Sequence, residues 1–118
     1  MTIDEKATEL GRLIGQSAEY QAVKRSNDAL NSDRAAVTLL RQMEQVRVEA
    51  QQMIERGQNP TAEMEQQLDD LLAKVQVNTT YQQAISAQEN FDKVMLRVND
   101  QIREGIRKGG TSSIITLA

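Results

Sequence analysis

The chain has 118 residues, a net charge of −3, a single proline, and neither cysteine nor histidine. One domain is expected at this length, and the strong helix formers that dominate the composition predict an all-α fold. Without cysteine and histidine there is no zinc or iron–sulfur ligation by these side chains, no imidazole base and no Ser–His or Cys–His nucleophile. We therefore expect no enzymatic activity, no catalytic or cofactor-binding residues, no metal and no cofactor.

Charge and hydropathy also limit the partners. The negative net charge provides no global attraction to nucleic acid or to anionic lipid, so direct nucleic-acid binding is not expected. No apolar run approaches the roughly 18 residues of a membrane span. The first six residues contain an acidic pair and no following apolar block, which is unlike a signal peptide. We expect a cytoplasmic protein with no membrane contact.

About five helices are predicted in chain order. The first begins with a capping box formed by Thr2 and Glu5, and a second begins at Ser17 as its N-cap. Residues 31–33 break the chain before a long helix over about 33–56, and residues 57–60 form a turn before a fourth helix that reaches Val75. The long third helix and the fourth carry apolar stripes at alternating spacings of three and four: Ala36, Leu39, Met43, Val46, Ala50 and Met53, then Met64, Leu68, Leu71 and Val75.

The fifth helix, predicted over residues 78–108, determines the expected architecture. Its stripe has the spacing of a packed helix seam and consists of Tyr81, Ala84, Gln88, Phe91, Met95, Val98, Ile102 and Gly105. At 1.5 Å per residue this helix is about 45 Å long, whereas a compact chain of this size is about 35 Å across. A second copy is the simplest cover for the protruding part. We therefore expect an antiparallel helical bundle with two long helices that forms a homodimer.

The residues expected to form the self-association seam are Tyr81, Phe91, Met95, Val98 and Ile102. The alternative is that the same stripe packs only on the third helix of its own chain. Gly109-Gly110 is expected to stop the fifth helix, which divides the chain into a bundle domain at residues 1–108 and a flexible tail at residues 109–118. The tail is apolar near its end and is predicted to dock on a groove of its own dimer or of a partner.

Three further patterns in the sequence are weaker. Glu63, Glu65 and Asp69 could form a carboxylate-only cation site, but a solvated helix face explains them better. Tyr20 and Tyr81 each follow a helix cap, and ring packing at a helix corner is favoured over ligand stacking. The basic residues of the last helix alternate with acids, which favours a solvated face with ion pairs over an RNA-binding face; the two sets are Lys93, Arg97, Arg103 and Arg107, and Asp92, Asp100 and Glu104.

The run of residues 10–20, LGRLIGQSAEY, resembles the opening of the YlbF/YmcA family of small helical bacterial proteins. The segment VQVN at residues 75–78 and residues 87–102 are similar too, and the resemblance covers residues 7–106. It implies an all-helical, commonly dimeric protein without a known enzymatic site. It also implies a regulator of competence, sporulation and biofilm development, in a complex linked to ribonuclease Y and RNA processing. Members of that complex hold iron–sulfur clusters through cysteines, and this chain departs from that pattern because it has none.

The predicted function is accordingly a non-enzymatic regulatory or scaffold protein that acts through protein–protein interaction. Two alternatives from other classes stay open, namely an RNA-binding accessory module and a helical chaperone or adaptor.

Overall fold

The computed structural model describes the backbone of residues 2–117 and the side chains of residues 2–111. Within that range the chain forms five helices and no strand, which confirms the predicted all-α class. The helices are α1 (Ile3–Gly15), α2 (Ala18–Ser32), α3 (Arg34–Glu55), α4 (Ala62–Gln76) and α5 (Thr79–Leu117). The two long helices are α3, with 22 residues, and α5, with 39.

The helix starts lie where the side-chain caps predict them. A threonine, serine or aspartate precedes each of the first four helices and accepts a hydrogen bond from the backbone N–H three residues further on. These caps are Thr2, Ser17, Asp33 and Thr61. Each cap satisfies one of the N–H groups that a helix start leaves without a partner inside the helix.

The predicted turn at residues 57–60 is confirmed. Gly57 has a φ of +78° and is the only described residue with a positive φ, a conformation that glycine adopts at no steric cost. Its N–H donates to the carbonyl of Ile54 at 3.0 Å, and the N–H of Gln58 donates to the carbonyl of Met53 at 2.8 Å. These two bonds form a Schellman motif, which ends α3 and reverses the chain toward α4.

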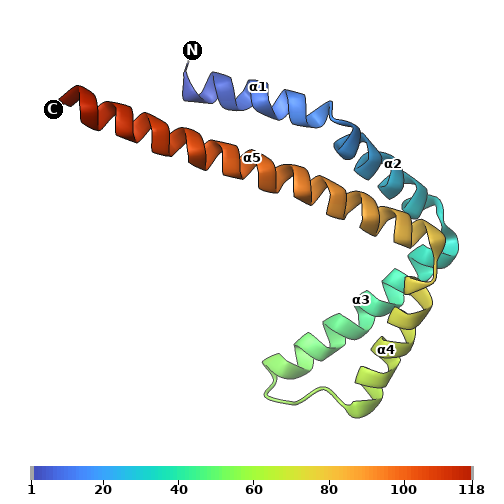
Figure 1. Ribbon diagram of the computed structural model, residues 1–118. Helices are drawn as coiled ribbons and strands as arrows, with labels where there is room; N and C mark the ends of the chain where they lie inside the picture. Colours follow the sequence, from blue (N-terminus) through green and yellow to red (C-terminus); the bar gives the residue numbers. More distant parts are fainter. Residues whose placement is uncertain (1, 118) are drawn as a thin grey trace.

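The helices form two antiparallel arms that meet at an elbow (Figure 1). In one arm α1 and then α2 run along α5 in the opposite direction; the other arm is the α3–α4 hairpin. The radius of gyration is 21.5 Å, compared with about 13.5 Å for a compact chain of this length. The fold is therefore an open arrangement of two helical arms. Much of each helix surface is not covered by another helix of the same chain.

The packed interior is small and lies along the two helix pairs. The side chains with less than a tenth of their surface exposed are Ala36, Val46, Leu71, Val75, Ala84 and Ala87. The apolar stripes predicted for α3 and α4 are confirmed, because every member is buried or half-buried. On α5, Ala84 of the predicted stripe is buried, whereas Gln88, Ile102 and Gly105 are exposed in the single chain. Ala87 takes the buried position instead of Gln88, since α2 lies over that side of α5.

The predicted helix stop at Gly109-Gly110 is wrong, because α5 continues through both glycines to Leu117. Neither glycine has a positive φ, and the hydroxyl of Thr111 donates to the carbonyl of Arg107 at 2.9 Å within the continuous helix. Glycine in a helix costs about 1 kcal/mol relative to alanine, which weakens a helix without ending it. The apolar side chains predicted to dock, Ile114, Ile115 and Leu117, lie outside the described side chains. The division into a domain and a flexible tail stays a prediction.

Candidate interaction surfaces

The elbow is held by two linked helix caps. Asn78 accepts a hydrogen bond from the N–H of Tyr81 through its Oδ1, at 2.9 Å, and so caps α5. Its Nδ2 donates to Oδ2 of Asp33 at 3.2 Å, while Oδ1 of Asp33 accepts from the N–H of Ala36 at 3.1 Å. One carboxylate and one amide thus connect the start of α3 to the start of α5, across 45 positions of the sequence.

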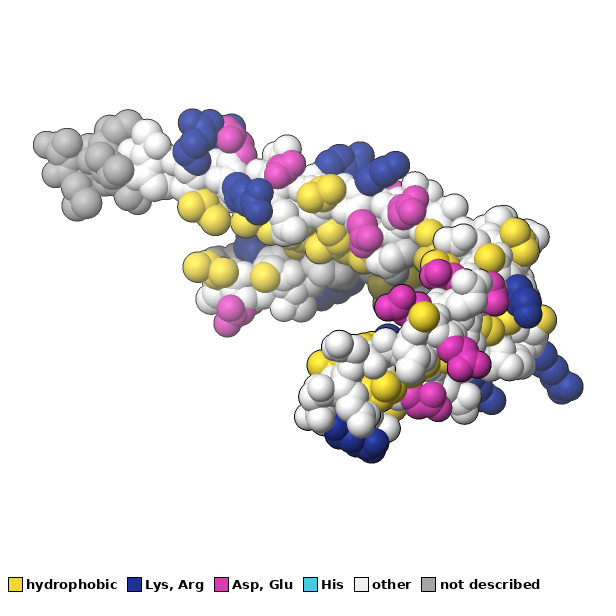
Figure 2. Space-filling view, turned by 90° about the horizontal axis from the view of Figure 1, so that it is seen from below, with side chains coloured by type: hydrophobic (Ala, Val, Ile, Leu, Met, Phe, Trp, Pro, Cys, Tyr) yellow, Lys and Arg dark blue, Asp and Glu magenta, His cyan; other side chains and the backbone are white. Residues whose placement is uncertain are grey.

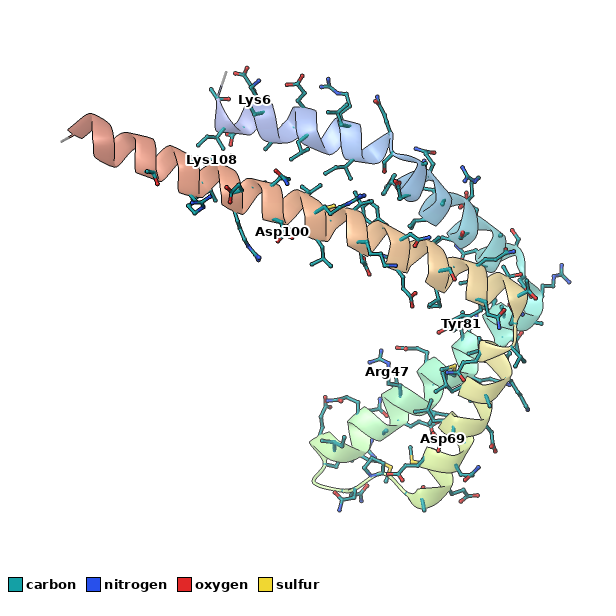
Figure 3. The ribbon with its side chains drawn as sticks, viewed as in Figure 1. Lys6, Arg47, Asp69, Tyr81, Asp100 and Lys108 are labelled. Carbon is teal, nitrogen blue, oxygen red and sulfur yellow. The ribbon has the colours of Figure 1, made fainter. Side chains whose placement is uncertain are left out.

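The hydrogen bonds at Asp33 favour its charged form. The backbone N–H of Ala36 is the largest influence, followed by the side chains of Asn78 and Thr80, and together they lower the pKa of the Asp33 carboxyl below its ordinary value of 3.8. Figure 3 places Tyr81 at this elbow, where the two arms meet. The relative position of the arms therefore depends on a small polar connection near the helix ends.

The first half of the predicted seam on α5 packs inside the chain. The ring of Phe91 lies against the ring of Tyr20 on α2, with the ring centres 5.5 Å apart and the planes tilted by 59°. Phe91 and its seam neighbours Tyr81, Met95 and Val98 are all half-buried. The helix that packs on the first half of this stripe is α2 and not the third helix, so the alternative that placed the stripe against the third helix is wrong.

The second half of the seam is open. Ile102 keeps 46% of its surface exposed and Ile106, one turn further on, keeps 68%. Ile3, the first residue of α1, is 87% exposed. Between α1 and α5 runs a groove of about 410 Å³ whose lining is mostly apolar: Leu10, Val94, Arg97, Val98, Gln101 and Ile102. Figure 2 shows hydrophobic side chains between the long rod of α5, which ends in grey, and the shorter helix beside it.

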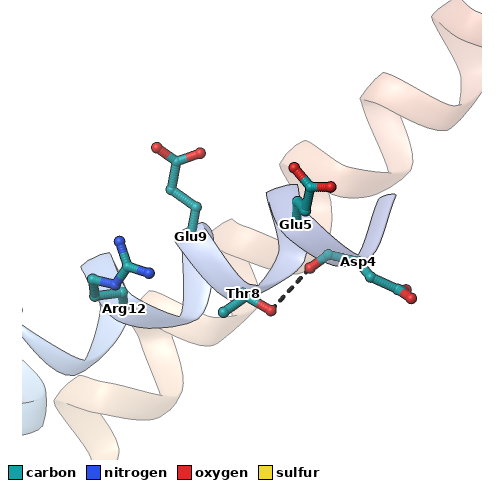
Figure 4. A pocket seen from close by; sticks show the side chains of 5 residues that line it. All are labelled: Asp4, Glu5, Thr8, Glu9 and Arg12. Atoms are coloured by element: carbon teal, nitrogen blue, oxygen red, sulfur yellow. Dashed lines mark hydrogen bonds between the residues drawn. The ribbon is translucent and has the colours of Figure 1, made fainter. Parts of the chain in front are cut away.

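A second hollow, of about 440 Å³, lies on α1 and is lined by Asp4, Glu5, Thr8, Glu9 and Arg12 (Figure 4). All five residues belong to one face of a single helix, and the hydroxyl of Thr8 donates to the carbonyl of Asp4 at 2.9 Å within that helix. A ligand there would be contacted from one side only. This surface is therefore a solvated helix face and not a binding pocket.

No group of three or more acidic side chains within the described part of the chain is arranged to hold a metal ion. Glu63, Glu65 and Asp69 are all exposed on α4, in agreement with the solvated face that the sequence favours. Tyr20 packs on Phe91, in agreement with ring packing at a helix corner.

Charges near the end of α5 pair within the helix. Arg107 bonds to Glu104, Lys108 lies 3.9 Å from the same carboxylate, and Arg103 lies 3.7 Å from Asp100. On α3 the guanidinium of Arg47 donates to Glu44 at 2.9 Å and lowers the pKa of that carboxyl. Such exposed pairs add little stability, but they give the helix a mixed charge pattern in place of a continuous basic stripe.

The α3–α4 hairpin has its own exposed apolar side chains. Ile54 is 55% exposed near the tip of the hairpin, and Val48 and Leu72 are exposed along its length. These residues lie on the arm that projects away from α1 and α5 (Figure 1). The chain therefore offers two separate apolar surfaces, one on each arm. Within the described residues no helix is long and apolar enough to cross a membrane.

Comparisons with known proteins agree with the resemblance noted in the sequence. A family profile described as "Control of competence regulator ComK, YlbF/YmcA" matches residues 3–107. A UPF0342 protein of Leuconostoc citreum is 24% identical over 106 residues, which are 90% of this chain and 90% of that protein. A UPF0342 protein of Desulfitobacterium hafniense is 27% identical, over 88% of this chain and 79% of its own length. One of Streptococcus pyogenes is 29% identical, over 79% and 82%.

Proposed function

Because the chain belongs to the YlbF/YmcA family, whose members are described as controlling the competence regulator ComK, we propose that it is a non-enzymatic regulatory protein that acts by binding other proteins. The observation that carries this proposal is the large uncovered surface of the two arms. The accessible surface is 9180 Å², compared with about 6,400 Å² for a compact folded protein of this mass. Exposed apolar patches beyond the ordinary level mark interaction sites on proteins.

The α3–α4 hairpin is the surface that we assign to the regulatory partner. Ile54 lies next to the turn, is 55% exposed, and belongs to the arm that projects away from α5 (Figure 1). The charged pair Glu44–Arg47 lies on the same helix and provides a polar rim. An apolar centre with a polar rim is the usual composition of a protein–protein interface.

The finer proposal comes from the family resemblance. We propose on this basis that the partner belongs to a complex linked to ribonuclease Y and RNA processing. Since the chain has no cysteine, its part in such a complex would not include holding an iron–sulfur cluster. The hairpin would then contribute protein contacts alone.

The test is co-purification of the affinity-tagged chain from its own cell, followed by mass spectrometry and reconstitution from purified components. We expect one defined complex, which is lost in Ile54→Glu because a charge replaces the exposed apolar side chain. Gln52→Glu adds the same charge elsewhere on α3 and is the matched control, so it should keep the complex.

Two results would contradict the proposal. Recovery of many unfolded client proteins would indicate a chaperone, and equal loss of the complex in both variants would remove the hairpin surface as the contact. Circular dichroism of both variants shows that any loss is not caused by unfolding.

A further inference from the structure

We infer that Gln21 and Gln82 act as braces between consecutive helices, and that the brace at Gln82 sets the angle between the two arms. Both glutamines end the same short pattern, which is a capping residue, two further residues, a tyrosine and a glutamine, at residues 17–21 and 78–82. The braces belong to the single chain and do not depend on the regulatory role assigned to the hairpin.

The first brace lies at the corner between α1 and α2. Ser17 is the N-cap of α2, and its Oγ accepts a hydrogen bond from the N–H of Tyr20 at 3.2 Å. The side-chain Nε2 of Gln21 donates to the carbonyl of Gly15 at 2.8 Å. Gly15 is the last residue of α1, and its carbonyl is one of those that a helix end leaves without a partner inside the helix. The start of α2 is thus tied to the end of α1.

The second brace has the same geometry at the corner between α4 and α5, which is part of the elbow. Asn78 caps α5 by accepting from the N–H of Tyr81 at 2.9 Å, and Nε2 of Gln82 donates to the carbonyl of Gln76 at 2.7 Å. Gln76 is the last residue of α4. At both corners two residues separate the helices, and the glutamine reaches across them to the last carbonyl of the preceding helix. The same pattern therefore forms the same pair of bonds twice.

The other two helix junctions have a cap but no brace. Four positions after the cap, where the braces have glutamine, α3 has Val37 and α4 has Glu65. Neither valine nor an ionised glutamate has a side-chain hydrogen to donate to a carbonyl. At the elbow only the junction between α4 and α5 is therefore braced, and the bond from Asn78 to Asp33, at 3.2 Å, connects the start of α3 to it.

The angle between the arms depends on the elbow because the arms contact each other mainly through the consecutive pairs α2–α3 and α4–α5. Only residue 33 and residues 77–78 lie between those helices, and such short segments absorb the backbone rotation when a hinge moves. With 22 residues α3 is about 33 Å long, so a rotation of about 10° at the elbow moves its far end by about 6 Å. A single bond at the elbow can therefore control the separation of the hairpin tip from α5.

The experiment measures the distance between the arms by pulsed electron spin resonance. Because the chain has no cysteine, Gln58→Cys in the hairpin turn and Asn99→Cys on α5 provide two exposed labelling sites and no others. Dilution with unlabelled chain restricts the signal to distances within one molecule. The otherwise unchanged chain should give one narrow distribution. Gln82→Glu keeps the size of the side chain but loses the donor, so the mean or the width of the distribution should change by about 6 Å or more.

Gln83→Glu is the matched control, because it makes the same substitution at the next position, which is also exposed. Gln21→Glu removes the brace of the other corner. Both should leave the distance between the arms unchanged. Since the bond of Gln82 is exposed, we expect the melting temperature of Gln82→Glu to stay within about 4 °C of the unchanged chain. An unchanged distance distribution in Gln82→Glu would overturn the proposal, whatever its melting temperature, and so would an equal change in either control.

Discussion

Val75 offers the sharpest test of how the chain is held together. Its side chain is 0% exposed and is the largest one that is fully buried, in the α4 helix that packs on α3. Val75→Ala removes two methyl groups, which corresponds to about 1.6 kcal/mol of lost burial. Since two helices with short side chains cannot fully close the space, a cavity term brings the expected loss to about 2–3 kcal/mol.

Val77→Ala is the matched control, because it makes the same substitution two positions away, where the side chain is 76% exposed. Its effect should stay within about 0.5 kcal/mol. With an unfolding entropy of about 0.25 kcal/mol/K for a chain of this length, Val75→Ala should lower the melting temperature by roughly 8–12 °C and Val77→Ala by about 2 °C or less. Thermal unfolding followed by circular dichroism, at one fixed protein concentration, measures both. Equal shifts in the two variants would refute the packing of α4 on α3 described above.

Three further predictions concern the elbow and the charged surface. Asn78→Ala removes the cap of α5 and the bond to Asp33, so the free energy of unfolding should fall by about 1 kcal/mol in urea titrations, and no change would mean that the elbow contributes nothing. Because the folded pKa of Asp33 is lowered, its stabilising effect is present above its ordinary pKa of 3.8 and is lost as the pH falls through the folded value. Asp33→Asn should therefore lose less stability than the wild type between about pH 5 and about pH 2, as shown by urea midpoints, and parallel curves would contradict this. The purified chain should not bind a generic RNA at submicromolar concentration in physiological salt, because acids alternate with the bases of α5; tight binding with a steep salt dependence would contradict it.

The local features of the fold could be predicted from the sequence because each depends on a few neighbouring residues. Ser17 and Asp33 cap helices through bonds that reach three residues, and Gly57 allows the backbone conformation that reverses the chain after α3. The stripes of α3 and α4 were also predictable, since helical spacing alone places Val46 and Leu71 on the inner faces.

Long-range features were harder to predict. A stripe with spacings of three and four on α5 can include either Ala87 or Gln88. Only the position of α2 over α5 determines that Ala87 is the buried one. The sequence contains no signal for the bond between Asp33 and Asn78, because two polar residues 45 positions apart have no periodic relation. For the same reason the two-arm shape could not be predicted, nor could the exposure of Ile102 at the end of the seam. The expected dimer seam stays a prediction.

Gly109-Gly110 disfavours a helix by local propensity, yet α5 continues through both residues. Two glycines disfavour the helix by about 2 kcal/mol relative to alanine, and apart from their sequence neighbours and the nearby backbone of α5 no atom lies within 4 Å of the position that a Cβ would take at either one. Residues 109–111 are exposed, so truncation after Lys108 removes no packed side chain among the described residues and leaves Arg107 and Lys108 at a helix C-terminus, where positive charge is favourable. We expect the truncated chain to melt within about 2 °C of the full chain. A drop of several degrees, measured at the same protein concentration, would instead place residues 109–118 in the packed structure and refute the predicted tail.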